Sequence, residues 1–434
     1  MSQVTQVYGG DEINAVVLDP GSAWTRVGWS AEDGPSFTVS SSYADRDGEA
    51  RYGDDQTYLV RDNVEIRNPM TDGVVSDWEH AAGLWKTSLA QCSPERTTEY
   101  LKESPLFITE QIWNTKENQK KTMELALEDL STPATYISKS PVLSLFSTGR
   151  GTGIVVDVGA QTASAAAVVD GFVLYKSAQR SLKAGDHLSK ICRSFLGSDI
   201  TPPYEVQAKE PVPLGEPAKF TKRSDLPPNI TTSFREHQID QVVNQFKESM
   251  VVVPDAAHTA VAPKPRVFEF PDGHSIQLLQ ERFDLGEGLF GNNSAVPMTD
   301  DDTNGGKSNS KAAENDDDVS QLNPWSEKGI TDLVVDCLRG CDVDARANLA
   351  NNIVVVGGTT LTQGFTERIN QDLQKIFPML KIRIFASGNL VERKNSAWIG
   401  GSILASLGTF HQLWVTKQEY EEVGSDQLAF KRFK

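Results

Sequence analysis

Three short runs of apolar residues stand out along the chain, and each leads directly into glycine or polar residues. The run at residues 15–18 is followed by Asp-Pro-Gly-Ser, the run at 154–156 by Asp-Val-Gly, and the run at 353–356 by Gly-Gly-Thr. Continuous apolar runs of this length are typical of strands buried on both faces of an α/β sheet. The pattern therefore predicts three buried strands that end in polar loops.

The first two runs share a longer pattern. Each reads apolar run, Asp, any residue, Gly, and then a second strand-like stretch, at residues 24–29 in one case and 162–169 in the other. Because a repeated unit usually means a repeated architecture, we expect two α/β halves that face one another. Apolar residues at helical spacing predict helices over residues 116–130, 238–250 and 365–377.

Two stretches depart from this pattern. Residues 291–324 contain no aromatic residue and carry two Asp triplets among Asn, Ser, Gly and Lys. Such a segment cannot bury enough apolar area to offset its ordering entropy, so we expect a disordered acidic insertion. Residues 40–55 are polar and charged, and they are expected to form an exposed loop.

Composition narrows the choice of partners. The 434 residues suggest two or three domains, and 59 acidic against 42 basic residues give a net charge of −17. This charge argues against direct DNA binding through phosphates, which depends on Lys and Arg. It suits basic partners such as histones, although the acidic insertion could equally be a solvating loop. No apolar run reaches the ~20 residues of a membrane helix.

Four cysteines are scattered along the chain, which is typical of a reducing compartment rather than a disulfide framework. Cys337 and Cys341 lie one helical turn apart, but no His or further Cys completes a zinc set nearby. We therefore interpret this pair as core thiols rather than as metal ligands.

The two Asp-x-Gly turns are the candidate chemistry. A glycine lets backbone N–H groups approach a phosphate closely, and the carboxylate can hold Mg²⁺ through water. Two such turns from opposite halves could hold a nucleotide's phosphates between them. A single Asp-x-Gly is also common in hairpin turns, so spacing alone leaves nucleotide binding and simple turns as alternatives.

Longer stretches resemble the actin family along nearly the whole chain. They are residues 143–146, 149–150, 271–273, 281–283, 341–346, 398–407 and 414–420. Further stretches resemble the nuclear actin-related proteins that chromatin remodellers and histone acetyltransferase complexes share. These are residues 7–12, 184–186, 202–204 and 208–210.

The resemblance implies an α/β fold of the actin, Hsp70 and sugar-kinase type, with duplicated domains flanking a nucleotide cleft. The first, smaller half would comprise residues 1–145 plus 392–434, and the second residues 146–391, with the 291–324 insertion. It also implies a non-catalytic nuclear subunit that acts in transcription regulation and DNA repair. Its expected partners are nuclear actin and a helix of the scaffold or motor subunit, and its expected cofactors are ATP and Mg²⁺.

The resemblance also places the nucleotide site. The expected contacts are Asp19, Gly21, Ser22 and Arg26 on the first phosphate loop, Asp157 and Gly159 on the second, Lys247 and Glu248 beside the adenosine, and Gly357, Gly358, Thr359 and Lys394 beside the purine. Asp19 and Asp157 would hold the Mg²⁺. Arg26 stands where actin has a lysine, which keeps the charge but changes its geometry. Without the resemblance, Lys247 and Glu248 would be read as a solvated helix face.

Hydrolysis needs a side chain that orients the attacking water. The actin positions for a glutamine, a histidine and an aspartate fall on Ser140, Ser164 and Ala160. Serine is short and alanine has no acceptor, so we expect ATP to be a structural ligand and the chain not to be an enzyme. A sugar kinase or chaperone-like ATPase would share the clamp but would need a catalytic base.

Filament formation is not expected, and neither is a cytoskeletal role. Residues 40–55 lack the apolar, glycine-rich tip that actin inserts into its neighbour, and the acidic insertion lies where actin makes lateral contacts. The cleft for a partner helix is expected around residues 136–146 and 349–352, where ordinary core packing is the alternative interpretation.

Overall fold

The computed structural model describes residues 14–255, 264–291 and 321–433, and its framework is a pair of six-stranded sheets. The first sheet has the order β21-β10-β9-β1-β2-β3, and the second runs β13-β12-β11-β19-β20, with β14 also pairing with β12. The strands of the first sheet are β1 Val16–Pro20, β2 Trp24–Trp29, β3 Phe37–Ser40, β9 Leu106–Glu110, β10 Ala134–Lys139 and β21 Val415–Thr416. Those of the second are β11 Gly153–Val158, β12 Ala163–Val169, β13 Phe172–Val173, β14 Gln179–Ser181, β19 Ile353–Val356 and β20 Ile384–Phe385.

The two sheets repeat one topology. Strand β1 is antiparallel to β2 and parallel to β9, and β9 is parallel to β10. In the same way β11 is antiparallel to β12 and parallel to β19, and β19 is parallel to β20. The predicted duplication and the three predicted buried strands are confirmed. The sheets draw on residues from the two expected halves, while the domain boundaries themselves stay a prediction.

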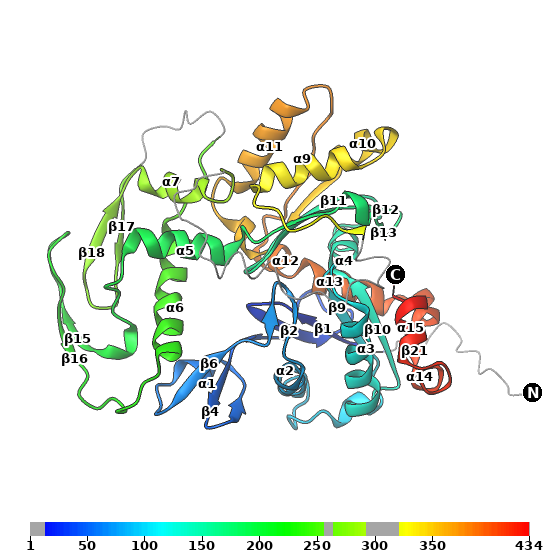
Figure 1. Cartoon of the computed structure of the whole chain (residues 1–434), viewed down its shortest axis with the longest axis horizontal. Helices are drawn as coiled ribbons and strands as arrows, with labels where there is room; N and C mark the ends of the chain where they lie inside the picture. Colours follow the sequence, from blue (N-terminus) through cyan, green and yellow to red (C-terminus); the bar gives the residue numbers. More distant parts are fainter. Residues whose placement is uncertain (1–13, 256–263, 292–320, 434) are drawn as a thin grey trace, which may run out of the picture.

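Helices surround and connect the sheets (Figure 1). Those of the first part of the chain are α1 Asp54–Tyr58, α2 Trp78–Ala90, α3 Lys116–Glu124 with a π-helical turn at Leu125–Asp129, α4 Ser140–Phe146, α5 Gly185–Leu196, α6 Thr232–Met250 and α7 Glu281–Glu287. The later ones are α9 Ile330–Gly340, α10 Val343–Ala350, α11 Phe365–Ile376, α12 Leu390–Lys394, α13 Ser396–Ser406, α14 Lys417–Val423 and α15 Ser425–Lys431. The three predicted helices are confirmed as α3, α6 and α11. Thr115 and Thr231 start α3 and α6 by accepting a backbone N–H with their side chains.

Helices α4 and α13 pack against one another between the two sheets (Figure 1). Helix α13 also lies against β1 and β9, while α4 lies against β11 and β19. The helices approach closely because Gly400 of α13 has no side chain, and a Cβ there would collide with the Leu143 carbonyl. This packing fixes how the ends of β1 and β11 face each other.

The expected loop over residues 40–55 is wrong, because this stretch is folded. It contains β4 Tyr43–Arg46 and β5 Glu49–Arg51, which pair with each other, and it leads into α1. Strand β4 also pairs with β6 Val64–Arg67. Tyr43 is only 1% exposed and stacks on His80 at 4.5 Å. Few apolar residues are needed here, since Ala44 and Val64 are the buried residues of this sheet that pack with Phe234 of α6.

Three two-stranded sheets lie apart from the two large sheets. The strands are β7 Met70–Thr71 with β8 Val74–Val75, β15 Val206–Glu210 with β16 Lys219–Lys222, and β17 Arg266–Glu269 with β18 Ser275–Leu278. Turn residues Asp47 and Gly48, with φ of 55° and 85°, join β4 to β5 in the two-residue manner typical of tight hairpins.

Residues 292–320 of the expected acidic insertion, and residues 1–13, lie outside the described residues. The last residues of the insertion are ordered, since Leu322 packs beside Ile112 and Trp113. Cys337 and Cys341 are 0% and 4% exposed, and the Cys341 thiol donates to the Cys337 carbonyl, which confirms the interpretation as core thiols. Within the described ranges, no helix is long and apolar enough to cross a membrane.

Candidate nucleotide-binding site

Asp19 lies at the end of β1 and is held from two sides. Its Oδ2 accepts from the Arg26 guanidinium at 2.9 Å, and its Oδ1 accepts from the Thr109 hydroxyl. Arg26 faces Asp19 because the two residues are partners in the β1–β2 register. Only 8% of Asp19 is exposed, so the carboxylate is fixed before any ligand arrives.

The turn that follows Asp19 is shaped by backbone bonds. The Gly21 N–H donates to the Trp24 carbonyl at 3.1 Å, and a Cβ on Gly21 would lie 2.8 Å from that oxygen. The Asn68 amide donates to the Ser22 carbonyl at 2.8 Å. Glycine is therefore required at this turn, as the Asp-x-Gly pattern predicts.

The second and third loops are bonded to each other. The Gly159 N–H donates to the Thr162 carbonyl at 2.9 Å, and the Gly159 carbonyl accepts from the Thr359 hydroxyl at 2.7 Å. Gly357 has φ of 95°, and a Cβ there would meet the Val158 carbonyl and lie 2.7 Å from Asp157 Oδ1. A Cβ on Gly358 would meet no atom within 4 Å, so the space beside this residue is open.

The two sheets bring Asp19 and Asp157 within electrostatic reach. Burial, followed by the negative charge of Asp19, raises the pKa of Asp157 to about 6, while Arg26 opposes the shift. A divalent cation would relieve this repulsion, and Mg²⁺ is typically held by one or two carboxylates plus ligand phosphates. In the described ranges no cluster of three or more His, Cys, Asp or Glu forms an all-protein metal site. The donors present therefore fit Mg²⁺ with a nucleotide.

Of the three residues predicted to lie beside adenosine, Lys247 is held by hydrogen bonds, whereas Glu248 and Lys394 are exposed. The Lys247 ammonium donates to Ser189 Oγ at 2.8 Å, to Asn244 Oδ1 at 2.9 Å and to the Gly185 carbonyl at 3.2 Å. Burial lowers the pKa of Lys247. Lys394 lies on α12, which is tied to the third loop where the Gly357 N–H donates to the Arg393 carbonyl at 3.0 Å. The predicted contacts of Lys247, Glu248 and Lys394 with adenosine stay predictions.

Sequence reasoning missed Thr109 and Gln161. Thr109 binds Asp19 from the neighbouring strand β9, and Gln161 of the second loop reaches the first half. Its amide donates to the Met70 carbonyl and its Oε1 accepts from the Gly73 N–H, both at 3.4 Å. The only signal for Thr109 is its position at the end of a fully buried strand. Gln161 gives no signal, because its contact depends on how the halves meet.

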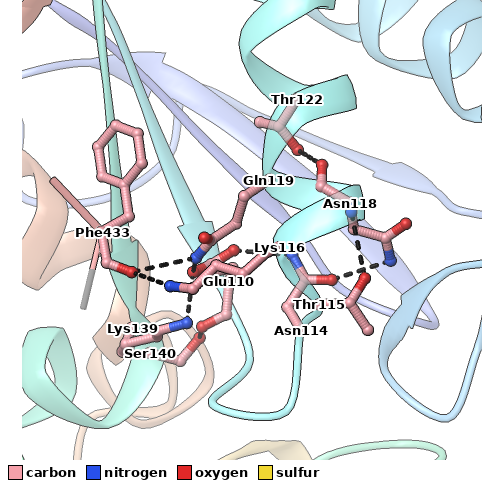
Figure 2. Close-up of polar contacts among 10 residues, drawn as sticks. All are labelled: Glu110, Asn114, Thr115, Lys116, Asn118, Gln119, Thr122, Lys139, Ser140 and Phe433. Carbon is pink, nitrogen blue, oxygen red and sulfur yellow. Dashed lines mark hydrogen bonds and ion pairs between the residues drawn. The ribbon is translucent and has the colours of Figure 1, made fainter. Parts of the chain in front are cut away.

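The Ser140 position is occupied by a buried polar network (Figure 2). The Ser140 hydroxyl donates to the Glu110 carbonyl at 2.9 Å, and the side chain carboxylate of Glu110 forms an ion pair with Lys139 at 2.7 Å. The charged side chains are only 5% and 7% exposed. The Lys116 ammonium donates to the Phe433 carbonyl at 2.8 Å, which ties the end of the described chain to α3. The Ser140 hydroxyl is thus used in a structural hydrogen bond.

The other two hydrolysis positions carry no strong acceptor. Ser164 pairs with Asp157 in the β11–β12 register and is 3% exposed. Ala160 presents its backbone carbonyl to the Asp186 N–H at 2.8 Å, and its methyl group cannot bind water. The expectation that these three side chains do not orient an attacking water stays a prediction.

A family model described as Actin matches residues 10–434. The chain belongs to the actin family. It is 41% identical to a protein of Yarrowia lipolytica named actin-related protein 4, an alignment that covers 99% of this chain and 98% of that protein. Proteins of the same name from Schizosaccharomyces pombe and Neurospora crassa are 39% and 37% identical, covering 97% and 98% of this chain and 97% and 96% of theirs.

Membership accounts for the doubled sheets, which form the actin fold expected from the sequence. Proteins of the actin family generally bind a nucleotide with Mg²⁺, and the three loops of this actin-family chain fit such a ligand. When bound, the cation would neutralise phosphate charge between Asp19 and Asp157. The chain's own residues hold those carboxylates in place through Arg26 and Thr109.

Burial and the nearby charge of Asp19 make ionised Asp157 unfavourable, so removing its charge should raise stability in a pH-dependent way. The raised pKa means that ionisation costs stability above about pH 6, and this cost shrinks as the pH falls from 6 toward 4. In protein freed of nucleotide and Mg²⁺, Asp157→Asn should raise the free energy of unfolding by about 2 kcal/mol at pH 8 and by less at pH 5. Urea unfolding at both pH values measures this.

The matched control is Asp170→Asn, which changes an exposed aspartate after the same hairpin's second strand. It should leave stability nearly unchanged at both pH values. A loss of stability in Asp157→Asn at pH 8, or an equal gain at both pH values, would contradict the repulsion between the two carboxylates.

Proposed function

We propose that this chain is a non-catalytic, ATP-holding subunit of nuclear chromatin-remodelling and histone acetyltransferase complexes. It acts in transcription regulation and DNA repair, and it pairs with nuclear actin on a helix of a scaffold or motor subunit. One observation carries the proposal. The residues expected to hold the phosphates, such as Asp19, are fixed in place, whereas the residues at the positions expected to orient the attacking water are two serines and an alanine. The name that the curated relatives share, actin-related protein 4, supports the same class of protein.

The proposal that the chain is non-catalytic rests on the positions of Ser140 and Ser164. Attack on a γ-phosphate needs a water held in line by a side chain acceptor. The Ser140 hydroxyl instead donates to the Glu110 carbonyl, and Ser164 is buried within the sheet. Asp157 Oδ1 lies beside Gly357, and a Cβ on the next residue, Gly358, would meet no atom within 4 Å. This combination favours tight binding without turnover.

We expect the purified chain to release phosphate from ATP at a rate close to background. Purified protein with saturating Mg·ATP should release phosphate no faster than an Asp157→Ala variant, because both lack a group that orients the water. A coupled phosphate assay measures both rates, with actin as the positive control.

Release that is well above background and is abolished by Asp157→Ala would contradict the proposal. It would favour the alternative function, a slow actin-fold ATPase.

The partner-helix site can be narrowed. Within residues 136–146 and 349–352, the side chains of Leu143, Leu145 and Leu349 are fully buried, so core packing is the correct interpretation for them. Exposed apolar residues lie next to this region instead. They are Phe172, Ile403, Leu407 and Leu413, with exposures of 73%, 40%, 45% and 45%. The aromatic ring of Phe146 lies 3.8 Å from the Cβ position of Gly171, which brings β13 next to the end of α4.

Ile403 and Leu407 lie one turn apart on the α13 side of this surface, suited to the apolar face of an amphipathic helix. Replacing both with Asp should weaken binding of a labelled scaffold-helix peptide by at least about tenfold, since charges would be buried in an apolar contact. Fluorescence anisotropy measures the dissociation constant.

The control is Leu214→Asp, which changes a 51% exposed apolar residue beside the β15–β16 ribbon, away from this surface. It should bind the peptide as the unchanged chain does. Equal binding by all three proteins, with intact thermal unfolding, would exclude this surface as the helix site.

We further propose that the chain does not form homo-filaments. The turn between β4 and β5 is the short charged sequence Arg46-Asp47-Gly48-Glu49, which offers no apolar tip for a neighbour. Purified protein in salt and Mg²⁺ should stay in the supernatant on ultracentrifugation, under conditions that pellet actin. Sedimentation of filaments would contradict this and favour the filament-forming alternative.

A further inference from the structure

Residues 323–326 follow the acidic insertion and are anchored to the second half. The Asn323 amide donates to the Lys176 carbonyl at 3.1 Å and to the Ala178 carbonyl at 2.9 Å. The Arg180 Nε donates back to the Asn323 carbonyl at 3.3 Å, and the Ser326 N–H donates to the Arg180 carbonyl at 2.9 Å. This short segment is therefore fixed along β14 of the second sheet, and we call it the strap.

The strap presents Trp325 to the first half. The Trp325 ring meets the Trp113 ring edge-on, with centroids 5.4 Å apart and an interplanar angle of 69°. The Arg180 guanidinium lies over the Trp325 ring, 4.6 Å from its centroid. Trp113 follows β9 of the first sheet, so this aromatic contact joins the two halves.

Trp113 is itself fixed on the phosphate side of the cleft. Its indole N–H donates to the Asp72 carbonyl at 2.8 Å, and the residue is 5% exposed. A Cβ on Gly73 would lie 3.3 Å from both the Trp113 ring and the Thr162 hydroxyl. Trp113 thus sits against the turn that touches the second phosphate loop.

We propose that Trp325 and Trp113 form a latch that holds the two halves closed and slows release of the bound nucleotide. This inference rests on the proposed function, because it takes the cleft as the nucleotide site. Any movement that widens the phosphate side must separate the two rings. The strap cannot follow the first half, since Asn323, Arg180 and Ser326 bind it to the second.

The test measures dissociation of a fluorescent ATP analogue from the full chain after a chase with excess ATP. Trp325→Ala should speed dissociation on the order of tenfold. Opening of the unchanged chain must break the aromatic contact and expose its buried area, and the variant has no such contact to break. Trp113→Ala also removes packing against Ala166 and Ala178, so it should speed dissociation at least as much, and the double variant should be no faster than Trp113→Ala. That non-additivity identifies one shared contact.

Two more variants separate a latch from general destabilisation. Trp325→Phe keeps an aromatic ring and should dissociate more slowly than Trp325→Ala, while Asn323→Ala loosens the strap without touching the first half and should speed dissociation. The control is Phe195→Ala, which removes one ring of a stacked pair with Phe246 inside the second half. It should leave the dissociation rate unchanged.

The outcomes distinguish this inference from the proposed function. Faster, non-additive dissociation in the Trp variants supports the latch. Nucleotide that is held equally long by all variants overturns the latch alone. If the chain binds no nucleotide at all, both the proposed function and the latch are overturned. If Phe195→Ala speeds dissociation as much as Trp325→Ala does, the effect comes from a general loss of stability and the latch is overturned.

Discussion

Two carboxylates of like charge, Asp19 and Asp157, are held close together at the ends of strands from different sheets. Burial and the charge of Asp19 raise the pKa of Asp157 to about 6, and Arg26 compensates only in part. Strands β1 and β11 occupy equivalent places in their sheets, and the packing of α4 against α13 brings their ends to face each other. A bound cation and triphosphate would relieve the repulsion, so the proposed ligand would be coupled to the fold through one pair of residues.

The proposal of binding without hydrolysis rests on the side chains around this pair. Arg26 and Thr109 fix Asp19, and the bonds between Gly159 and Thr359 join the second and third loops. The Ser140 hydroxyl donates instead to the backbone carbonyl of Glu110. The buried carboxylate of Glu110 pairs with Lys139 and also accepts from the Asn114 amide at 2.7 Å. In the proposed function, a bound nucleotide holds the two halves in register, and the exposed apolar residues of α13 offer a surface to a partner helix.

Much of this could be predicted from the sequence. The strands that end at Asp19, Asp157 and Gly357 have uninterrupted apolar runs, and the loops need glycine for backbone reasons that a sequence reveals. The β4–β5 hairpin was hidden because its burial depends on Tyr43 and Ala44 alone, amid charged residues. The Trp113–Trp325 contact and the reach of Gln161 were hidden because they arise only where the halves meet. Lys247 was correctly placed on a helix, but its turn toward Ser189 depends on tertiary packing.

We propose above all that the loops around Asp19 and Asp157 hold an ATP molecule whose triphosphate stays intact. The most direct measurement is to denature the purified chain, remove the protein and quantify the released nucleotide by chromatography and mass. We predict close to one ATP per chain, and little of it after Asp157→Ala. Release of no nucleotide, or of ADP in place of ATP, would contradict the account.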